Sequence, residues 1–218
     1  MIMKKTLSFL LFIFCVFSSQ AEIIKTKVKS DAMNKDIPCV IITPTNYNPS
    51  ATYPVIYLLH GYGGNQNTWP DIKKDLSQTA TQDSIIFVCP NGENSWYWDS
   101  PFNKESQFET FISKELVSYV DKNFSTRDDR TGRAITGLSM GGHGALWLAI
   151  RHQDIFGAAG STSGGVDIRP FPDNWDMKKH IANIVIENVS YKYCYNKKLH
   201  INKIYTYILA ISEYKYRF

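Results

Sequence analysis

Cysteine is scarce in this sequence, and its cysteines are widely spaced. The chain has 4 cysteines, and no two of them form a Cys-x-x-Cys pair, so neither a disulfide framework nor a zinc site is indicated. Cys39 and Cys89 fall in apolar runs, where a free cysteine behaves as a small apolar residue. Together with Cys194 they leave open a single bridge between two of the three.

A membrane-spanning apolar run is also missing. The apolar stretch Leu7–Phe17 has 11 residues, well short of the roughly 20 that cross a bilayer. Lys4 and Lys5 precede it and Ser19-Gln20-Ala21 follows it, which is typical of an export signal cleaved after Ala21. We therefore expect the mature chain to be secreted or periplasmic and not attached to a membrane.

Clustered basic charge is absent from the body of the chain. The net charge is +4, but the basic residues of 1–21 and 183–218 account for more than all of it, and residues 22–182 carry a net −2. No group of Lys and Arg there is interleaved with stacking aromatics. The sequence therefore gives no indication of a nucleic-acid partner.

Residues 183–218 contain neither glycine nor proline. The turn residues that punctuate the upstream sequence stop here, and the segment offers no evident boundaries for further strand and helix crossovers. We interpret the chain as an export signal over 1–21, one domain over 22–182, and a discordant tail over 183–218 that is foreign to the fold.

Short apolar runs alternate with amphipathic segments inside the domain. Residues 55–59 and 85–88 are apolar on both alternating faces, which is typical of central strands covered on both sides. Residues 105–124 repeat apolar side chains three, four or seven apart, which predicts a helix. This alternation favours an α/β fold with a mostly parallel sheet flanked by helices. We expect strands at 37–43, 55–59, 85–88, 133–136 and 157–161, and helices at 68–80, 105–124 and 140–151.

The stretch from Gly137 to Ala145 contains Gly-x-Ser-x-Gly, with Ser139 at its centre, between a predicted strand and a predicted helix. A nucleophilic serine needs such a sharp turn, which exposes its hydroxyl beside a helix N-terminus that stabilises negative charge. Gly137 and Gly141 remove side chains that would clash there. The alternative is a plain glycine-rich turn, and the strand and helix context favours the nucleophile.

A second glycine-rich element, residues 60–64 (His-Gly-Tyr-Gly-Gly), follows the apolar strand at 55–59. Its position predicts an oxyanion loop, with the amide of Tyr62 and the amide of Met140 stabilising a tetrahedral intermediate. The glycines let the backbone approach a substrate closely. His60 is a candidate substrate-binding residue in the same element.

Two further groups of residues bear on ligands. Trp96 and Trp98 lie in a loop after the predicted strand at 85–88, where they could stack on a sugar or aryl ester or equally cover the core. Asp167, Asp173 and Asp176 are separated by Pro and Asn, which favours a solvated loop over a metal site. No metal or organic cofactor is indicated.

Four stretches, in this order, resemble the putative esterase family of α/β hydrolases: 57–61, 94–100, 137–145 and 160–165. This family includes esterase D, feruloyl and acetylxylan esterases, and mycolyl transferases. The resemblance implies an α/β-hydrolase fold, Ser139 as the nucleophile, and the amides of Tyr62 and Met140 as oxyanion donors.

The family's triad acid and base follow the serine, in segments resembling Gly-x-Asp-Asp-Phe and Gly-x-His-x-Trp. Neither segment occurs after Ser139. His143 lies on the predicted helix that follows the serine, where local packing or bonding is expected, and His152 lies at the end of that helix. His180 and His200 lie in or next to the tail, and nothing flanks these two to orient an imidazole. We leave the acid and base unassigned and expect a truncated chain that lacks the C-terminal strands of the fold.

These features predict a serine carboxylic ester hydrolase that forms an acyl-enzyme on Ser139. The expected substrate is a small-molecule or glycan ester of feruloyl or acetyl type. An acyltransferase of the same family and a catalytically inactive fragment remain the alternatives. The sequence leaves open the acyl group, the alcohol and the oligomeric state.

Overall fold

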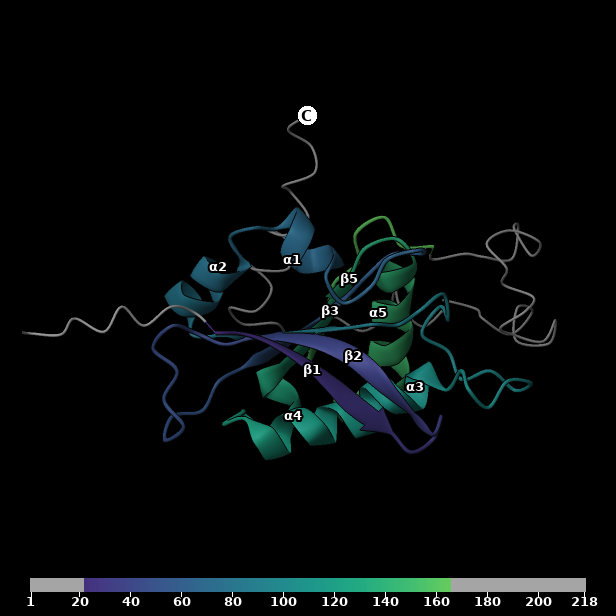
Figure 1. The fold of residues 1–218 in the computed structure, drawn as a ribbon, viewed down its shortest axis with the longest axis horizontal. Coiled ribbons are helices and arrows are strands. Elements are labelled where there is room, and N and C mark those ends of the chain that lie inside the picture. The colour runs from purple at the N-terminus through teal and green to yellow at the C-terminus, as the bar shows by residue number, and fades with distance from the viewer. Residues whose placement is uncertain (1–21, 166–218) are drawn as a thin grey trace, which may run out of the picture.

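The computed structural model describes residues 22–165 of the chain. Within this range six strands form one sheet in the order β1-β2-β4-β3-β5-β6 (Figure 1). The last four strands in this order are mutually parallel, whereas β1 and β2 form an antiparallel hairpin whose second strand is antiparallel to β4. The strands are β1 (Ile23–Ser30), β2 (Lys35–Ile42), β3 (Val55–Leu59), β4 (Ile86–Pro90), β5 (Arg133–Gly137) and β6 (Ala158–Ala159).

The three central strands are buried at every position. Alternate residues of each strand therefore contribute to two apolar cores, one on each face of the sheet. Tyr57 belongs to one core, and its neighbours Ile56 and Leu58 belong to the other. This arrangement confirms the prediction of a mostly parallel sheet with helices on both faces.

Helices cover the two faces unequally (Figure 1). On one face, Trp69, Leu76 and Ala80 pack on the sheet and complete the smaller core. On the other face, helical residues between Phe108 and Leu148 pack on the sheet and complete the larger core. The smaller layer is α1 (Thr68–Ile72) and α2 (Leu76–Asp83). The larger layer is α3 (Phe108–Thr110), the π-helical segment η1 (Phe111–Leu116), α4 (Val117–Asn123) and α5 (Met140–Arg151); a short 3-10 helix, η2 (Arg130–Gly132), precedes β5.

Two predicted helices differ from the observed ones. The helix predicted at 68–80 is broken at Lys73, whose backbone (φ −123°, ψ 82°) ends α1. Trp69 is anchored to the end of β3 through a hydrogen bond from its Nε1 to Leu59 O (2.8 Å), while α2 packs on β2 and β4. The helix predicted at 105–124 begins only at Phe108, because the Phe108 amide donates to Trp98 O (3.1 Å) and holds the preceding residues in a loop.

Strand β1 was not predicted, although its sequence contains a signal for it. Lys25, Lys27 and Lys29 are exposed and alternate with residues on the other, more buried face of the strand, where Val28 and Ser30 are fully buried. This period of two is typical of an edge strand with one solvated face. The strand predicted at 157–161 is present but reduced to two residues.

Cys39 and Cys89 are both buried on neighbouring strands but point to opposite faces of the sheet, because each belongs to a different core. A bridge between these two is therefore excluded. Burial raises the pKa of the Cys39 thiol to about 12 and raises the pKa of Cys89 as well. Cys194, the export signal at 1–21 and the tail at 183–218 lie outside the described residues.

Candidate active site

Ser139 occupies the turn between β5 and α5, as the sequence predicts. Its backbone has φ 54° and ψ −116°, a combination that residues with a side chain rarely adopt. The turn is fixed from both sides, since the Ser139 amide donates to Thr162 O (2.8 Å) and the Ser139 carbonyl accepts from the His143 amide (3.0 Å). The residue itself is exposed. The strained turn thus presents a hydroxyl to solvent at the N-terminus of α5.

Glycine is required on both sides of this turn. A Cβ added at Gly137 would lie 2.2 Å from Gly141 O, and one added at Gly141 would lie 2.2 Å from Leu59 O. Both contacts are with backbone atoms, which have no rotamer to move away. This confirms the prediction that the two glycines allow the close turn.

The loop after β3 lies directly against Ser139. A Cβ added at Gly61 would be 3.5 Å from the Cβ of Ser139. The loop closes on itself through a bond from the Gly64 amide to Gly61 O (3.0 Å), and the Gly63 amide donates to Asn94 Oδ1 (2.7 Å). Tyr62 therefore stands on a braced loop beside the serine.

Met140 directly follows Ser139 in the chain. It is the first residue of α5, and the first amides of a helix have no acceptor within the helix. The helix dipole adds a partial positive charge at this end. The two amides that the sequence assigns to an oxyanion hole thus lie on the two backbone segments that meet at Ser139.

His60 is buried and supports the loop. Its Nδ1 lies 2.7 Å from Gly61 O, and its Nε2 accepts from the Gly92 amide (2.8 Å), which assigns the neutral tautomer with the proton on Nδ1. Burial lowers the pKa of His60 and favours this neutral form. With 1% of the residue exposed, the ring offers no nitrogen to a substrate, and its position points to holding the loop rather than to the substrate contact expected from the sequence.

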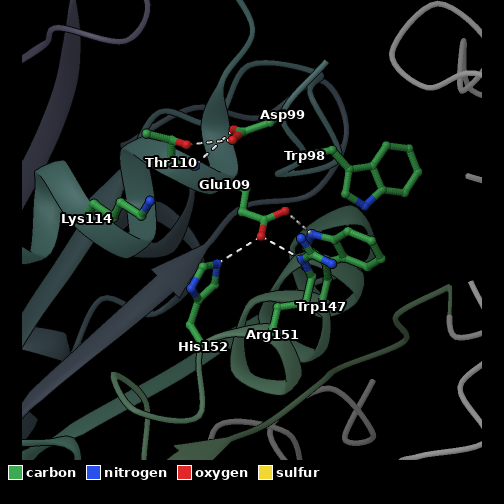
Figure 2. A pocket seen from close by; sticks show the side chains of 8 residues that line it. All are labelled: Trp98, Asp99, Glu109, Thr110, Lys114, Trp147, Arg151 and His152. Carbon is green, nitrogen blue, oxygen red and sulfur yellow. Dashed lines mark hydrogen bonds and ion pairs between the residues drawn. The ribbon is translucent and has the colours of Figure 1, made fainter. Parts of the chain in front are cut away.

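Trp96 and Trp98 are buried, with exposed fractions of 4% and 2%. Their rings stack on each other with centroids 5.7 Å apart, and both meet the ring of His143 edge-on. Of the two roles left open by the sequence, this position favours core packing at Trp96. Trp98 also lines the cavity shown in Figure 2. Trp96 and Tyr97 both have positive φ, so the loop is held in a strained conformation by its packing.

Among the described residues, no histidine forms a hydrogen bond to Ser139 through its imidazole ring. His143 is fully buried, its Nδ1 lies 2.7 Å from Gly165 O, and burial lowers its pKa to about 4. His152 follows the last residue of α5, roughly 20 Å along the helix from the serine. His180 and His200 lie outside the described residues.

Sequence reasoning missed Glu109 as a residue of interest. Its side chain is largely buried among apolar helix residues and bonds to Trp147, Arg151 and His152 (Figure 2). The available signal was a carboxylate inside the apolar stripe of the helix predicted at 105–124. Its partners lie about 40 residues away in sequence, so the cluster itself could not be predicted.

No group of three or more His, Cys, Asp or Glu side chains in residues 22–165 is arranged to hold a metal ion. No helix in this range has the length and apolarity needed to cross a bilayer. The aspartates at 167, 173 and 176 lie outside it.

Residues 30–198 match the family model described as Putative esterase. The chain belongs to this family. It is 34% identical over 148 residues to an esterase of Mycobacterium tuberculosis, which covers 66% of this chain and 32% of that protein. It is 35% identical over 151 residues to a diacylglycerol acyltransferase/mycolyltransferase of Mycobacterium leprae, which covers 65% of this chain and 43% of that protein.

The solved structure of a ferulic acid esterase has the same fold, with a TM-score of 0.67 and 29% identity over 82% of this chain and 73% of that one. The architecture is therefore an α/β-hydrolase fold, as the resemblance implied. The chain spans about a third of the length of the esterase relative from Mycobacterium tuberculosis.

Proposed function

We propose that this protein hydrolyses carboxylic esters through an acyl-enzyme on Ser139. One observation carries the proposal: an exposed serine stands on a strained strand-to-helix turn, next to a glycine loop. Hydrogen bonds from the amides of Gly63 and Gly64 hold this loop in place. A buried or helical serine would have no such role. The membership of the esterase family supports the same reaction.

The reaction follows in two steps. Ser139 Oγ attacks the ester carbonyl carbon, and the resulting oxyanion accepts hydrogen bonds from the amides of Tyr62 and Met140. The bond to the alcohol then breaks, and the alcohol leaves with the proton that the serine lost. Water attacks the acyl-enzyme in the same way, which releases the carboxylic acid and restores the serine.

Proton transfer requires a base, and the three described histidines are used elsewhere. His60 and His143 are buried in backbone bonds, and His152 lies at the far end of α5. The base therefore stays unassigned, and His180 and His200 lie outside the described residues. The same observation favours the rival function, a chain that binds esters without turning them over.

The names of the relatives support a substrate class. A ferulic acid esterase among the similar structures supports an aryl or acetyl ester linked to a carbohydrate. The mycolyltransferase relative supports the alternative of acyl transfer to a sugar hydroxyl. Product analysis with and without an added sugar acceptor separates the two, since only transfer yields a new ester.

Hydrolysis of a nitrophenyl ester tests the proposal. We expect turnover by the full chain and its loss in Ser139→Ala to the level of the buffer, because the acyl acceptor is removed. Ser118→Ala is the matched control, since Ser118 is an exposed serine on α4. Equal rates for the wild type and Ser139→Ala would contradict the proposal.

A further inference from the structure

Three of the five residues 60–64 are glycine, so the backbone of this loop has unusual conformational freedom. The Gly64 amide closes a turn onto Gly61 O (3.0 Å), and the third residue of the turn, Gly63, has φ 75°. Tyr62 is not among the residues with positive φ. This combination defines a type II β-turn with Tyr62 and Gly63 at its centre.

The central peptide of this turn, between Tyr62 and Gly63, has an alternative orientation. A type I turn keeps the closing bond but reverses this peptide, and the third residue of the turn then has negative φ. Glycine adopts either sign of φ at similar cost. A Cβ added at Gly63 would meet nothing within 4 Å, so close packing around this residue does not hold the peptide in place.

A hydrogen bond from another segment selects the observed orientation. The Gly63 amide donates to Asn94 Oδ1 (2.7 Å), a residue 31 positions away in sequence. A backbone amide only donates, so the side-chain atom that it meets is the carbonyl oxygen of the asparagine. In the reversed peptide the Tyr62 carbonyl would face this oxygen instead, and two acceptors form no hydrogen bond.

The segment that carries Asn94 is fixed on both sides of it. The Gly92 amide donates to His60 Nε2 (2.8 Å). Ser95 Oγ donates to Gly92 O (2.6 Å) and accepts from the Tyr97 amide (3.0 Å). Tyr97 is fully buried, and its hydroxyl donates to His60 O (3.1 Å). The acceptor on Asn94 therefore has a defined position from which it can select one form of the turn.

The peptide before Tyr62 is held by a separate contact. Gly61 O accepts from the Gly64 amide and lies 2.7 Å from Nδ1 of His60. Both peptide planes that flank Tyr62 are thus fixed, one through His60 and one through Asn94. The second plane carries a dipole of about 3.5 D next to the proposed oxyanion donor. Dipoles that are oriented in advance stabilise an oxyanion without reorganisation during the reaction.

We propose that Asn94 is a positioning residue for the candidate active site. Its side-chain oxygen holds residues 61–64 in the type II form, which keeps the backbone around the Tyr62 amide in one arrangement. Without this oxygen both forms of the turn are populated, so only a fraction of the molecules is competent at any time. The kinetic consequence rests on the proposed function at Ser139, whereas the hold on the turn does not.

Steady-state hydrolysis of a nitrophenyl ester by the full chain tests the kinetic consequence. We expect kcat to fall about three- to tenfold in Asn94→Ala, the factor that one neutral hydrogen bond supplies, with KM changed less than about twofold. Asn48→Ala is the matched control, because the exposed Asn48 Oδ1 also accepts from a backbone amide, that of Ser50 (2.9 Å). This control should leave both constants unchanged, and the two variants should have similar urea midpoints.

Hydrogen exchange of the Gly63 amide, followed in ¹⁵N spectra of the full chain, tests the turn itself. We expect exchange about three- to tenfold faster in Asn94→Ala than in the wild type, because the acceptor of this amide is removed. Asn94→Asp should restore slow exchange, since a carboxylate oxygen accepts the same bond. Asn48→Ala should leave the exchange rate unchanged.

The two measurements separate failure of the inference from failure of the proposed function. An inactive wild type with the expected exchange pattern would refute ester hydrolysis and support the hold of Asn94 on the turn. An active wild type with equal kcat in Asn94→Ala and Asn48→Ala would overturn the positioning role. A Gly63 exchange rate that Asn94→Ala leaves unchanged, or that is as fast in Asn94→Asp as in Asn94→Ala, would overturn it as well.

Discussion

Ser139 adopts a backbone conformation that costs free energy, since a residue with a side chain held at φ 54° and ψ −116° is strained by about 1–3 kcal/mol. The bonds to Thr162 O and from the His143 amide hold it there. In return the hydroxyl points outward beside the glycine loop. Strain at this residue therefore serves the presentation of a nucleophile and works against stability.

Ser139→Gly should raise the free energy of unfolding by about 1 kcal/mol while it removes esterase activity, because glycine adopts this conformation without strain. Urea denaturation measures the change. Ser118→Gly, inside α4, is the control and should lower stability by about 1 kcal/mol. A Ser139→Gly variant less stable than the wild type would show that the turn is not strained.

The sequence predicts the residues that form the turn. It does not predict the roles of the residues that pack around the turn, such as His60 and Trp96. Ser139, Gly137 and Gly141 form one local sequence pattern, and their geometry follows from strand and helix on either side. The role of His60 depends on Gly92, which is 32 residues away in sequence. The burial of Trp96 likewise depends on a helix that follows much later.

At the scale of elements, α5 sets the position of the turn that holds Ser139. Its first residue, Met140, directly follows Ser139. The glycines at its start let it approach the end of β3. The packing of this one helix against β3 and β5 therefore sets the geometry of the candidate active site.

Gly141→Ala should lower the free energy of unfolding by about 3 kcal/mol, because the new methyl group would overlap Leu59 O in an already full interior. Gly63→Ala is the matched control. Gly63 has positive φ (75°) but nothing within 4 Å of an added Cβ, so only about 1 kcal/mol of backbone strain is expected. Chemical denaturation compares the two, and equal losses would refute the close approach of α5 to β3.

Element boundaries followed from sequence where local pattern and tertiary packing agree. Strand β3 and helix α5 were predicted to the residue, since an apolar run and a motif define them. Residues 68–80 contain no glycine and have their one proline in the first turn, which predicts a single helix, yet the backbone leaves the helix at Lys73, after the anchored Trp69. A local sequence pattern does not predict tertiary contacts of this kind.

At the scale of the whole molecule, buried imidazoles make stability depend on pH. Burial lowers the pKa of His143 to about 4, against about 6.5 in an unfolded chain. Between these values the unfolded chain binds a proton that the folded chain excludes, so stability is lost as pH falls through this window, by roughly 3 kcal/mol in full. The lowered pKa of His60 acts in the same direction.

Urea unfolding at pH 7.5 and pH 5.0 measures this effect. The loss of stability on acidification should be smaller in His143→Gln than in the wild type by about 2 kcal/mol, because the variant has no imidazole to protonate on unfolding. The carboxylates common to both chains contribute equally to the pH dependence of stability, so their contribution cancels in the comparison. An identical pH dependence in the two chains would exclude His143 as the source.

The central claim is that Ser139 is a nucleophile, and reaction with a fluorophosphonate probe followed by peptide mass spectrometry tests it most directly. The account predicts one covalent adduct, on the peptide that contains Ser139, present in the wild type and in Ser118→Ala and absent from Ser139→Ala. An unlabelled wild-type chain, or an adduct that survives in Ser139→Ala, would contradict it.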